Sequence, residues 1–212
     1  MAVGVAGRIW NRAQGILAPI LAAAALAGLA ASAADAVELS AEDQADVQRI
    51  EDYLNSIGSM KARFLQVDAA GGNVQGTLFI LRPGRLRFEY DEPSPILIVA
   101  DGTWVHYHDK ELDQTSRALI SDTTVEFFTR GDLKLSGDIT VREFTREDGL
   151  INITIVDTDN PDEGSVTFTF DGSPLNLRQW VVTDPEGAQT LVALLSFETN
   201  VSLDQNMFYF SD

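Results

Sequence analysis

The sequence predicts a mainly β protein built as an antiparallel meander. Short runs of alternating apolar residues recur from Met60 onward, and brief links rich in Gly, Pro, Asn and Asp separate them. Links this short join antiparallel neighbours, because a parallel crossover takes about a dozen residues or more. About ten such strands, with two or three helical pieces, are typical of a sandwich or barrel.

The N-terminus is typical of a secretory signal. Arg8 and Arg12 precede an apolar run from Ile16 to Leu29, and small residues follow at 31–36. A membrane anchor is the alternative, but the run is short for a bilayer span. We expect a signal peptide over residues 1–36, cleaved at about residue 33–36, and a single domain over residues 37–212. The protein would then work outside the cytoplasm, in a bacterial periplasm.

The first element of that domain is an amphipathic helix. Ser40-Ala41-Glu42-Asp43 resembles a capping box, and apolar residues follow at Val47, Ile50, Leu54 and Ile57 before Gly58. A short helix over 121–129 is expected farther along, with Ser121 or Asp122 as its cap and Gly131 after its end. Strands are expected over 60–67, 74–81, 86–90, 96–100, 104–107, 139–144, 150–156, 165–170, 175–183 and 190–197.

The stretch from Gly76 to Pro93 holds two of these strands, joined at Arg82-Pro83-Gly84-Arg85. Pro followed by Gly suits a type II turn. Alternation puts Leu78, Ile80 and Arg82 on one face of the hairpin, together with Leu86, Phe88 and Tyr90, while Arg87 and Glu89 point away. An arginine therefore stands at the edge of an apolar surface, where its donors need acceptors.

Composition excludes several functions and leaves others open. The net charge of −17, from 32 acidic and 15 basic residues, argues against nucleic-acid binding and against adsorption to anionic lipid. The sequence has no cysteine and so no thiol chemistry or disulfide. A secreted hydrolase that uses paired carboxylates stays open, since acidic residues are plentiful.

The two histidines, His106 and His108, share a strand face and could hold a metal with Asp101 or Asp109. An exposed polar strand face is the alternative that we favour. The acidic segment 157–164 departs from calcium-loop spacing, and we interpret it as a solvated hairpin loop. We predict no catalytic residue, metal or cofactor.

These residues carry a resemblance to the LolA-type outer-membrane lipoprotein carriers. The matching motifs follow one another over about residues 45 to 117: Phe64-Leu65-Gln66, Gly76-Thr77-Leu78, Leu81-Arg82-Pro83-Gly84, Arg87-Phe88-Glu89-Tyr90, Pro93, Ala100-Asp101-Gly102-Thr103-Trp104 and Glu111-Leu112-Asp113-Gln114. Phe208-Tyr209-Phe210 matches a Phe-x-Phe near the end of the family, and a Pro-x-Gly-Val tail that many members carry does not follow here before Asp212.

The resemblance implies a half-open antiparallel barrel with a helical lid. It also implies a non-enzymatic periplasmic carrier, a monomer, that receives acylated lipoproteins from an inner-membrane ABC exporter and gives them to an outer-membrane acceptor lipoprotein. The lid contacts would be Arg82, Val125 and Phe128. Six residues would bind the acyl chains: Phe64, Leu78, Ile80, Leu86, Phe88 and Tyr90.

Two alternatives accompany this interpretation. Apart from the resemblance, the six apolar residues are more typical of an ordinary core, with Arg82 and Arg85 as turn residues whose charges reach water. A periplasmic acyl-chain or lipoprotein sensor of the same fold is the other candidate function.

Overall fold

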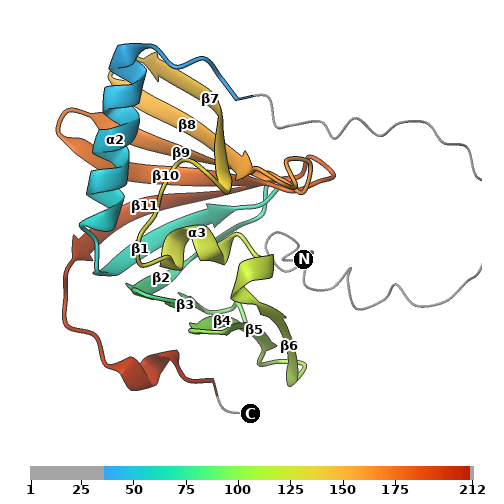
Figure 1. Ribbon diagram of the computed structural model, residues 1–212. Helices are drawn as coiled ribbons and strands as arrows, with labels where there is room; N and C mark the ends of the chain where they lie inside the picture. The colour runs from blue at the N-terminus through green and yellow to red at the C-terminus, as the bar shows by residue number, and fades with distance from the viewer. Residues whose placement is uncertain (1–35, 211–212) are drawn as a thin grey trace, which may run out of the picture.

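The computed structural model describes residues 36–210 as one strongly curved antiparallel sheet with helices on its inner side (Figure 1). Over these residues eleven strands pair in the order β6-β5-β4-β3-β2-β1-β11-β10-β9-β8-β7. One half consists of β1 (Ser59–Val67), β2 (Asn73–Leu81), β3 (Arg85–Tyr90), β4 (Ile96–Asp101), β5 (Trp104–Asp109) and β6 (Gln114–Leu119). The other half consists of β7 (Ile139–Glu147), β8 (Leu150–Asp157), β9 (Ser165–Gly172), β10 (Leu175–Thr183) and β11 (Gln189–Thr199).

The sheet curls without closing, because β6 and β7 form its two edges in the described part of the chain and do not pair with each other. Register shifts at Arg63/Phe64, Val141/Glu143 and Leu177/Gln179 mark bulges or irregularities, which bend strands and increase their twist. The concave face so formed carries alternate residues of the strands, and these pack into one apolar core. The fold class predicted from the sequence, a half-open antiparallel barrel, is confirmed.

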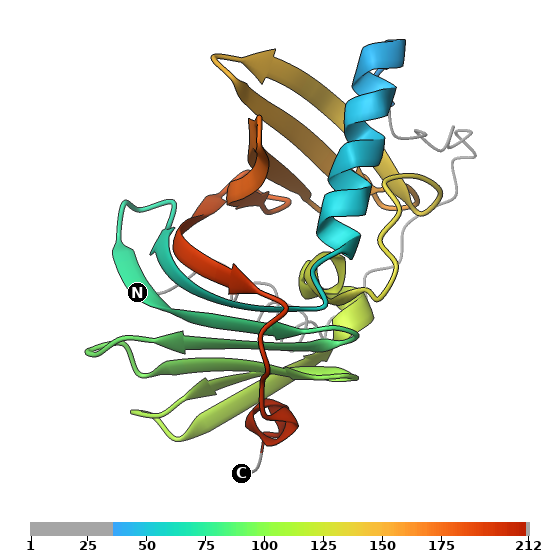
Figure 2. The ribbon, with the colours of Figure 1, turned by 90° about the vertical axis from the view of Figure 1, so that its left-hand side faces the viewer.

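Helix α2 (Ala41–Asn55) runs along the open side of the curved sheet (Figure 2). Its start has the predicted capping box: the Asp43 amide donates to the Ser40 hydroxyl at 3.1 Å, and the Asp43 carboxylate accepts from the Ser40 amide at 3.0 Å. Ile50 and Leu54 are buried against the sheet. Amphipathic spacing thus explains both why this segment is helical and which face it turns inward.

The chain crosses from β6 to β7 through η1 (Ile120–Asp122), α3 (Val125–Thr129) and an irregular loop. The helix predicted over 121–129 therefore exists only in part, and its predicted cap is wrong. Neither Ser121 nor Asp122 caps it: Thr124 stands at its N-cap without a side-chain hydrogen bond, and α3 ends at Thr129, ahead of Gly131. Asp122 belongs to the preceding 3-10 turn instead.

The C-terminal segment lies on the convex face. In η2 (Gln205–Phe208), Phe208 is buried, and the main-chain oxygen of Met207 accepts a hydrogen bond from Arg87 at 2.9 Å. Leu97 and Val99 are buried on this face of β4, which η2 contacts. Among residues 36–210, no helix combines the length and apolar character needed to cross a membrane. The predicted signal peptide, apart from Ala36, lies outside the described residues.

Candidate functional site

Three aromatic side chains form the centre of the concave surface on β1 and β3. The Phe64 ring stands nearly perpendicular to the rings of Phe88 and Tyr90 at centroid distances of 5.1 and 5.4 Å, and Phe88 stacks beside Tyr90 at 6.2 Å. Such edge-to-face pairs are favoured by ring quadrupoles. Gly76 lies against Phe64, where an added Cβ would stand 2.6 Å from the ring, so only glycine fits there.

The Tyr90 hydroxyl is the polar group of this aromatic cluster. Tyr90 Oη donates to Gln66 Oε1 at 2.8 Å, and both groups are largely covered. Burial raises the pKa of Tyr90 far above its ordinary value, so the hydroxyl stays neutral at physiological pH. The cluster therefore presents a surface that is apolar and uncharged.

The remaining predicted lining residues lie beside this cluster, as alternation required. Leu78 pairs with Phe88 and Ile80 pairs with Leu86 across the β2–β3 hairpin. Phe64, Leu78, Ile80 and Leu86 are all 4% exposed or less. The six residues predicted from the sequence thus share one surface. Helix α3 contacts β2 and β3 beside it, and apolar residues of α2 and α3 pack into the same core.

Arg82 stands where that surface meets the helices, at the end of the β2–β3 hairpin. Its Nη1 donates to the Leu54 carbonyl of α2 at 2.6 Å, and its Nε donates to the Phe128 carbonyl of α3 at 3.0 Å. Both acceptors lie in the last turn of their helix, where carbonyls carry partial negative charge, and the Leu54 carbonyl also accepts the Ile57 amide at 3.3 Å. Burial lowers the pKa of Arg82, although a guanidinium stays charged at neutral pH.

The turn that holds Arg82 also contacts α3 directly. Gly84 has a φ of 78°, as the predicted turn requires of glycine at this position, and the Arg82–Pro83 peptide is cis. The Gly84 amide donates to the Thr129 carbonyl at 2.8 Å. The hairpin turn is therefore joined to α3 through main chain as well as through the arginine.

The two other predicted lid residues face different parts of the core. Val125 is buried in the apolar cluster, at 5% exposure. The Phe128 ring reaches across to the second half of the sheet, 4.8 Å from the Trp180 ring and 5.5 Å from Phe168. Arg82 therefore holds α3 to the first half by its backbone, while Phe128 packs it on the second half.

A second arginine holds the other end of α2, and no local sequence pattern predicts this contact. Arg146 on β7 forms ion pairs with Asp43 and with Asp46, the latter at 2.7 Å, and Asp46 also pairs with Arg49. The Ser40 hydroxyl, and then Arg146, hold the pKa of Asp43 below its ordinary value. Only long-range pairing explains this contact, since Arg146 and Asp43 lie 103 residues apart in the sequence.

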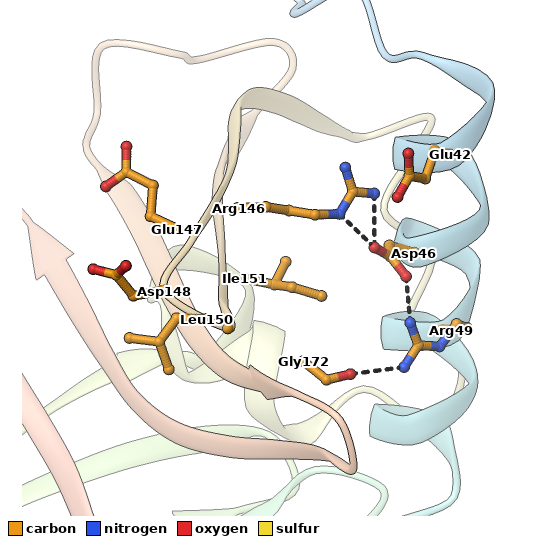
Figure 3. Close-up of a pocket in the computed structure, with 10 residues that line it drawn as sticks. Glu42, Asp46, Arg49, Arg146, Glu147, Asp148, Leu150, Ile151 and Gly172 are labelled. Carbon is orange, nitrogen blue, oxygen red and sulfur yellow. Dashed lines mark hydrogen bonds and ion pairs between the residues drawn. The ribbon is translucent and has the colours of Figure 1, made fainter.

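A pocket of about 400 Å³ opens beside this clamp, between α2 and the β7–β8 hairpin (Figure 3). Its walls carry Glu42, Asp46, Arg49, Arg146, Glu147 and Asp148 over a floor that includes Ile151. Arg49 spans part of it and donates to the Gly172 carbonyl at 3.0 Å (Figure 3). The charged walls make this pocket unlike the apolar concave surface.

The two histidines contact other side chains, and the exposed polar face that we favoured is wrong for His106, which is buried. His106 Nε2 lies 2.9 Å from Asp101 Oδ2, while His108 Nδ1 lies 3.1 Å from the Thr115 hydroxyl. Phe210 stacks on His106 at 4.9 Å. Over residues 36–210, no three His, Asp or Glu side chains gather as metal ligands would.

The acidic segment 157–164 forms the predicted loop between β8 and β9. Asp157 Oδ1 accepts from the amides of Asp159 and Asn160 at 2.9 and 2.8 Å. These bonds close the turn within its own residues, which explains the acidic side chain at Asp157.

Comparison with known proteins agrees with this geometry. Residues 55–211 match the family described as "Outer membrane lipoprotein carrier protein LolA". An outer-membrane lipoprotein carrier protein of Methylococcus capsulatus is 26% identical over 172 residues, covering 77% of this chain and 82% of its own. One from Cupriavidus pinatubonensis is 28% identical over 207 residues, covering 91% and 92%.

Among solved structures, a DUF1329 family protein from Desulfovibrio piger superposes with a TM-score of 0.50 at 10% identity, covering 77% of this chain and 95% of its own. At that identity the likeness concerns the fold alone. The family match, which spans most of the described residues, carries the assignment. The chain belongs to the LolA family of outer-membrane lipoprotein carrier proteins, which are carriers and not enzymes.

Proposed function

We propose that this carrier holds the acyl chains of its lipoprotein cargo against the concave surface around Phe64. The single observation that supports this most is the position of Arg82, which bonds both covering helices at the rim of that surface. The lining residues are Phe64, Leu78, Ile80, Leu86, Phe88 and Tyr90. The covering residues are Val125 and Phe128, held by Arg82.

The surface is suited to hydrocarbon because it is apolar and neutral. Among the side chains of the six lining residues, the one polar group is the Tyr90 hydroxyl, which is already hydrogen-bonded to Gln66 at 2.8 Å. An acyl chain that enters this space would leave no buried hydrogen-bond donor without a partner. Its burial would therefore carry no free-energy cost from unpaired polar groups. The acidic outer charge of the protein would keep two loaded carriers apart.

Release requires that the gain from burial is partly offset. Burial contributes about 0.8 kcal/mol per CH₂, so one sixteen-carbon chain held completely would gain roughly 12 kcal/mol. A carrier that hands its cargo on must therefore bury chains in part, or must lose other interactions on opening. Separating the helices from Arg82 removes two charge-assisted hydrogen bonds, each of which contributes about 1.5–3 kcal/mol.

The route of the cargo follows from this role. The family is periplasmic. We infer that residues 1–36 direct export of this chain and that 37–212 form one carrier domain. It would work as a monomer, take lipoproteins from an inner-membrane ABC exporter and give them to an outer-membrane acceptor lipoprotein.

The test is release of lipoprotein from spheroplasts of a Gram-negative bacterium with an active exporter. The purified domain is added, and the medium is searched for soluble complexes of the domain with lipoprotein. We expect complexes when the domain is present and none without it. Retention of all lipoprotein in the spheroplasts, with a known family member releasing it in parallel, would contradict the proposal.

A further inference from the structure

The loop Gly131–Gly137, between α3 and β7, has no regular secondary structure and yet fills part of the core. Leu133 is 1% exposed and Leu135 is 5% exposed, while Lys134 between them is exposed. The two leucines thus point inward on either side of an outward lysine. The loop therefore inserts two leucines into the same apolar cluster that holds the concave surface.

The backbone of this loop is held by two side chains of α2. Asn55 makes both of its bonds to Leu133: Nδ2 donates to the Leu133 carbonyl at 3.0 Å, and the Leu133 amide donates to Oδ1 at 2.8 Å. The Leu135 amide donates to Glu51 Oε1 at 2.7 Å. Among the described residues, no main-chain hydrogen bond joins 132–136 to the sheet. The middle of the loop is thus attached to the helix.

The ends of the loop are fixed by other means. Arg130 and Asp138, which flank it, form an ion pair at 2.7 Å. The Thr158 hydroxyl donates to the Gly137 carbonyl at 2.9 Å, and Gly137 has a φ of 80°, a conformation that favours glycine. Because its middle is attached to α2 while its ends are held in place, the loop can bend with α2 when that helix moves.

We propose that Gly131–Gly137 is a displaceable plug of the acyl-chain site. When α2 moves away from Arg82, Asn55 and Glu51 draw Leu133 and Leu135 out of the apolar space, and the acyl chain takes their place. In the unloaded protein the same leucines keep that space filled, because an empty cavity would destabilise the fold. This inference rests on the proposed function, and it adds the part of the core that the cargo replaces.

The test measures spin-label distances in the full domain, which has no native cysteine to interfere. Three exposed positions report on the helix, the plug and the sheet: Asp52→Cys, Lys134→Cys and Glu198→Cys. On adding a tripalmitoylated lipopeptide, we expect both the 52–198 and 134–198 distances to change, and the 52–134 distance to stay the same.

Each other outcome overturns a defined statement. If the lipopeptide binds and the 134–198 distance is unchanged, the loop is static core and the plug is wrong, while the proposed function stands. If the 52–134 distance changes too, Asn55 and Glu51 do not couple the loop to α2. If the native domain binds no lipopeptide, the proposed function fails and the plug with it.

Two variants test whether the acyl chain replaces Leu133 in the core. Leu133→Ala shortens the plug, so the cargo displaces less packed surface, and lipopeptide affinity should rise severalfold. Leu112→Ala, at an exposed leucine of the β5–β6 hairpin, should leave affinity unchanged. A folded Leu133→Ala domain with unchanged or weaker affinity would overturn the exchange. Because that truncation can prevent folding, Leu133→Val provides the same comparison with a smaller loss of volume.

Discussion

Two arginines hold the two ends of α2, and they use different partners. Arg82 donates to uncharged main-chain carbonyls at 2.6 and 3.0 Å, in surroundings dry enough to lower its pKa. Arg146, an exposed side chain, pairs with the carboxylates of Asp43 and Asp46, of which Asp46 is buried. Salt and water therefore screen the Arg146 contact more strongly than the Arg82 contact.

The difference teaches which end gates the site. Separating the Arg82 end leaves carbonyls and a guanidinium to find new partners at an apolar rim. At the other end, water reaches Arg146 and Asp43, and Asp46 keeps its ion pair with Arg49. We infer that the Arg82 end controls entry to the concave surface and that the Arg146 end anchors the helix. Four changes, from the largest expected effect to the smallest, test this contrast.

The largest effect is expected for Arg82→Leu. Loss of two charge-assisted hydrogen bonds removes the bias toward the covered state, so the variant should accept lipoprotein and pass it on about tenfold more slowly or worse. Transfer of radiolabelled lipoprotein to acceptor-containing vesicles measures this. Arg85→Leu, in the same turn, is the control and should transfer normally. Equal transfer by both variants would refute the gating role.

The second-largest effect is expected for Asn55→Ala. It leaves the amide and carbonyl of Leu133 without partners in a covered site, at a cost of about 1–3 kcal/mol of unfolding free energy. Urea unfolding followed by tryptophan fluorescence measures the change. Gln48→Ala, on the exposed side of the same helix, should stay within about 0.5 kcal/mol of the native protein. If the two variants are equally stable, the Asn55 contacts contribute nothing.

Arg146→Gln should have a smaller and salt-dependent effect. Surface ion pairs contribute about 1 kcal/mol or less, and that contribution falls as ionic strength rises. We expect the stability difference from the native protein to shrink between 0.05 and 1 M NaCl, concentrations chosen to span a Debye length of roughly 14 to 3 Å. The difference for Asn55→Ala should persist over that range. A salt-independent Arg146 effect would show that the anchor is less exposed than this account requires.

The smallest effect is expected in acid, where Asp43 loses its contribution to the free energy of unfolding. Because folding lowers the pKa of Asp43, its contribution is present above the unfolded-state pKa of about 3.9 and disappears as pH falls through the lower folded value. The stability gap between native protein and Asp43→Asn should therefore be constant near neutral pH and close in acid. NMR titration checks the cause: Ser40→Ala should raise this pKa more than Arg146→Gln does. The opposite order would contradict the assignment.

The concave surface was predictable because strand alternation is a local signal. Leu78, Ile80, Leu86, Phe88 and Tyr90 share a face by sequence position alone, and the register of one short hairpin then brings them together. Arg82 was marked for the same reason, as a charge at the end of an apolar face. Its acceptors, Leu54 and Phe128, became specific only in the fold.

The contacts that the sequence did not reveal depend on distant pairing. Asn55 and Leu133 are 78 residues apart, and nothing near either one indicates the other. Strand β6 was missed for a different reason: Gln114–Leu119 is a mostly exposed edge strand, so it lacks the apolar alternation that marks a half-buried one. The helix at 121–129 was overextended because Ser121 and Asp122 resemble caps, although tertiary packing places them in a 3-10 turn.

Photo-crosslinking with a diazirine-bearing palmitoylated lipopeptide tests the central claim most directly. After irradiation and digestion, mass spectrometry identifies the labelled residues. We expect labels on the concave surface, on peptides containing Phe64, Leu78 and Leu86, and their loss under competition by unlabelled lipopeptide. Labels concentrated instead at exposed apolar residues such as Leu195 and Tyr209, which are 55% and 62% exposed, would contradict the account.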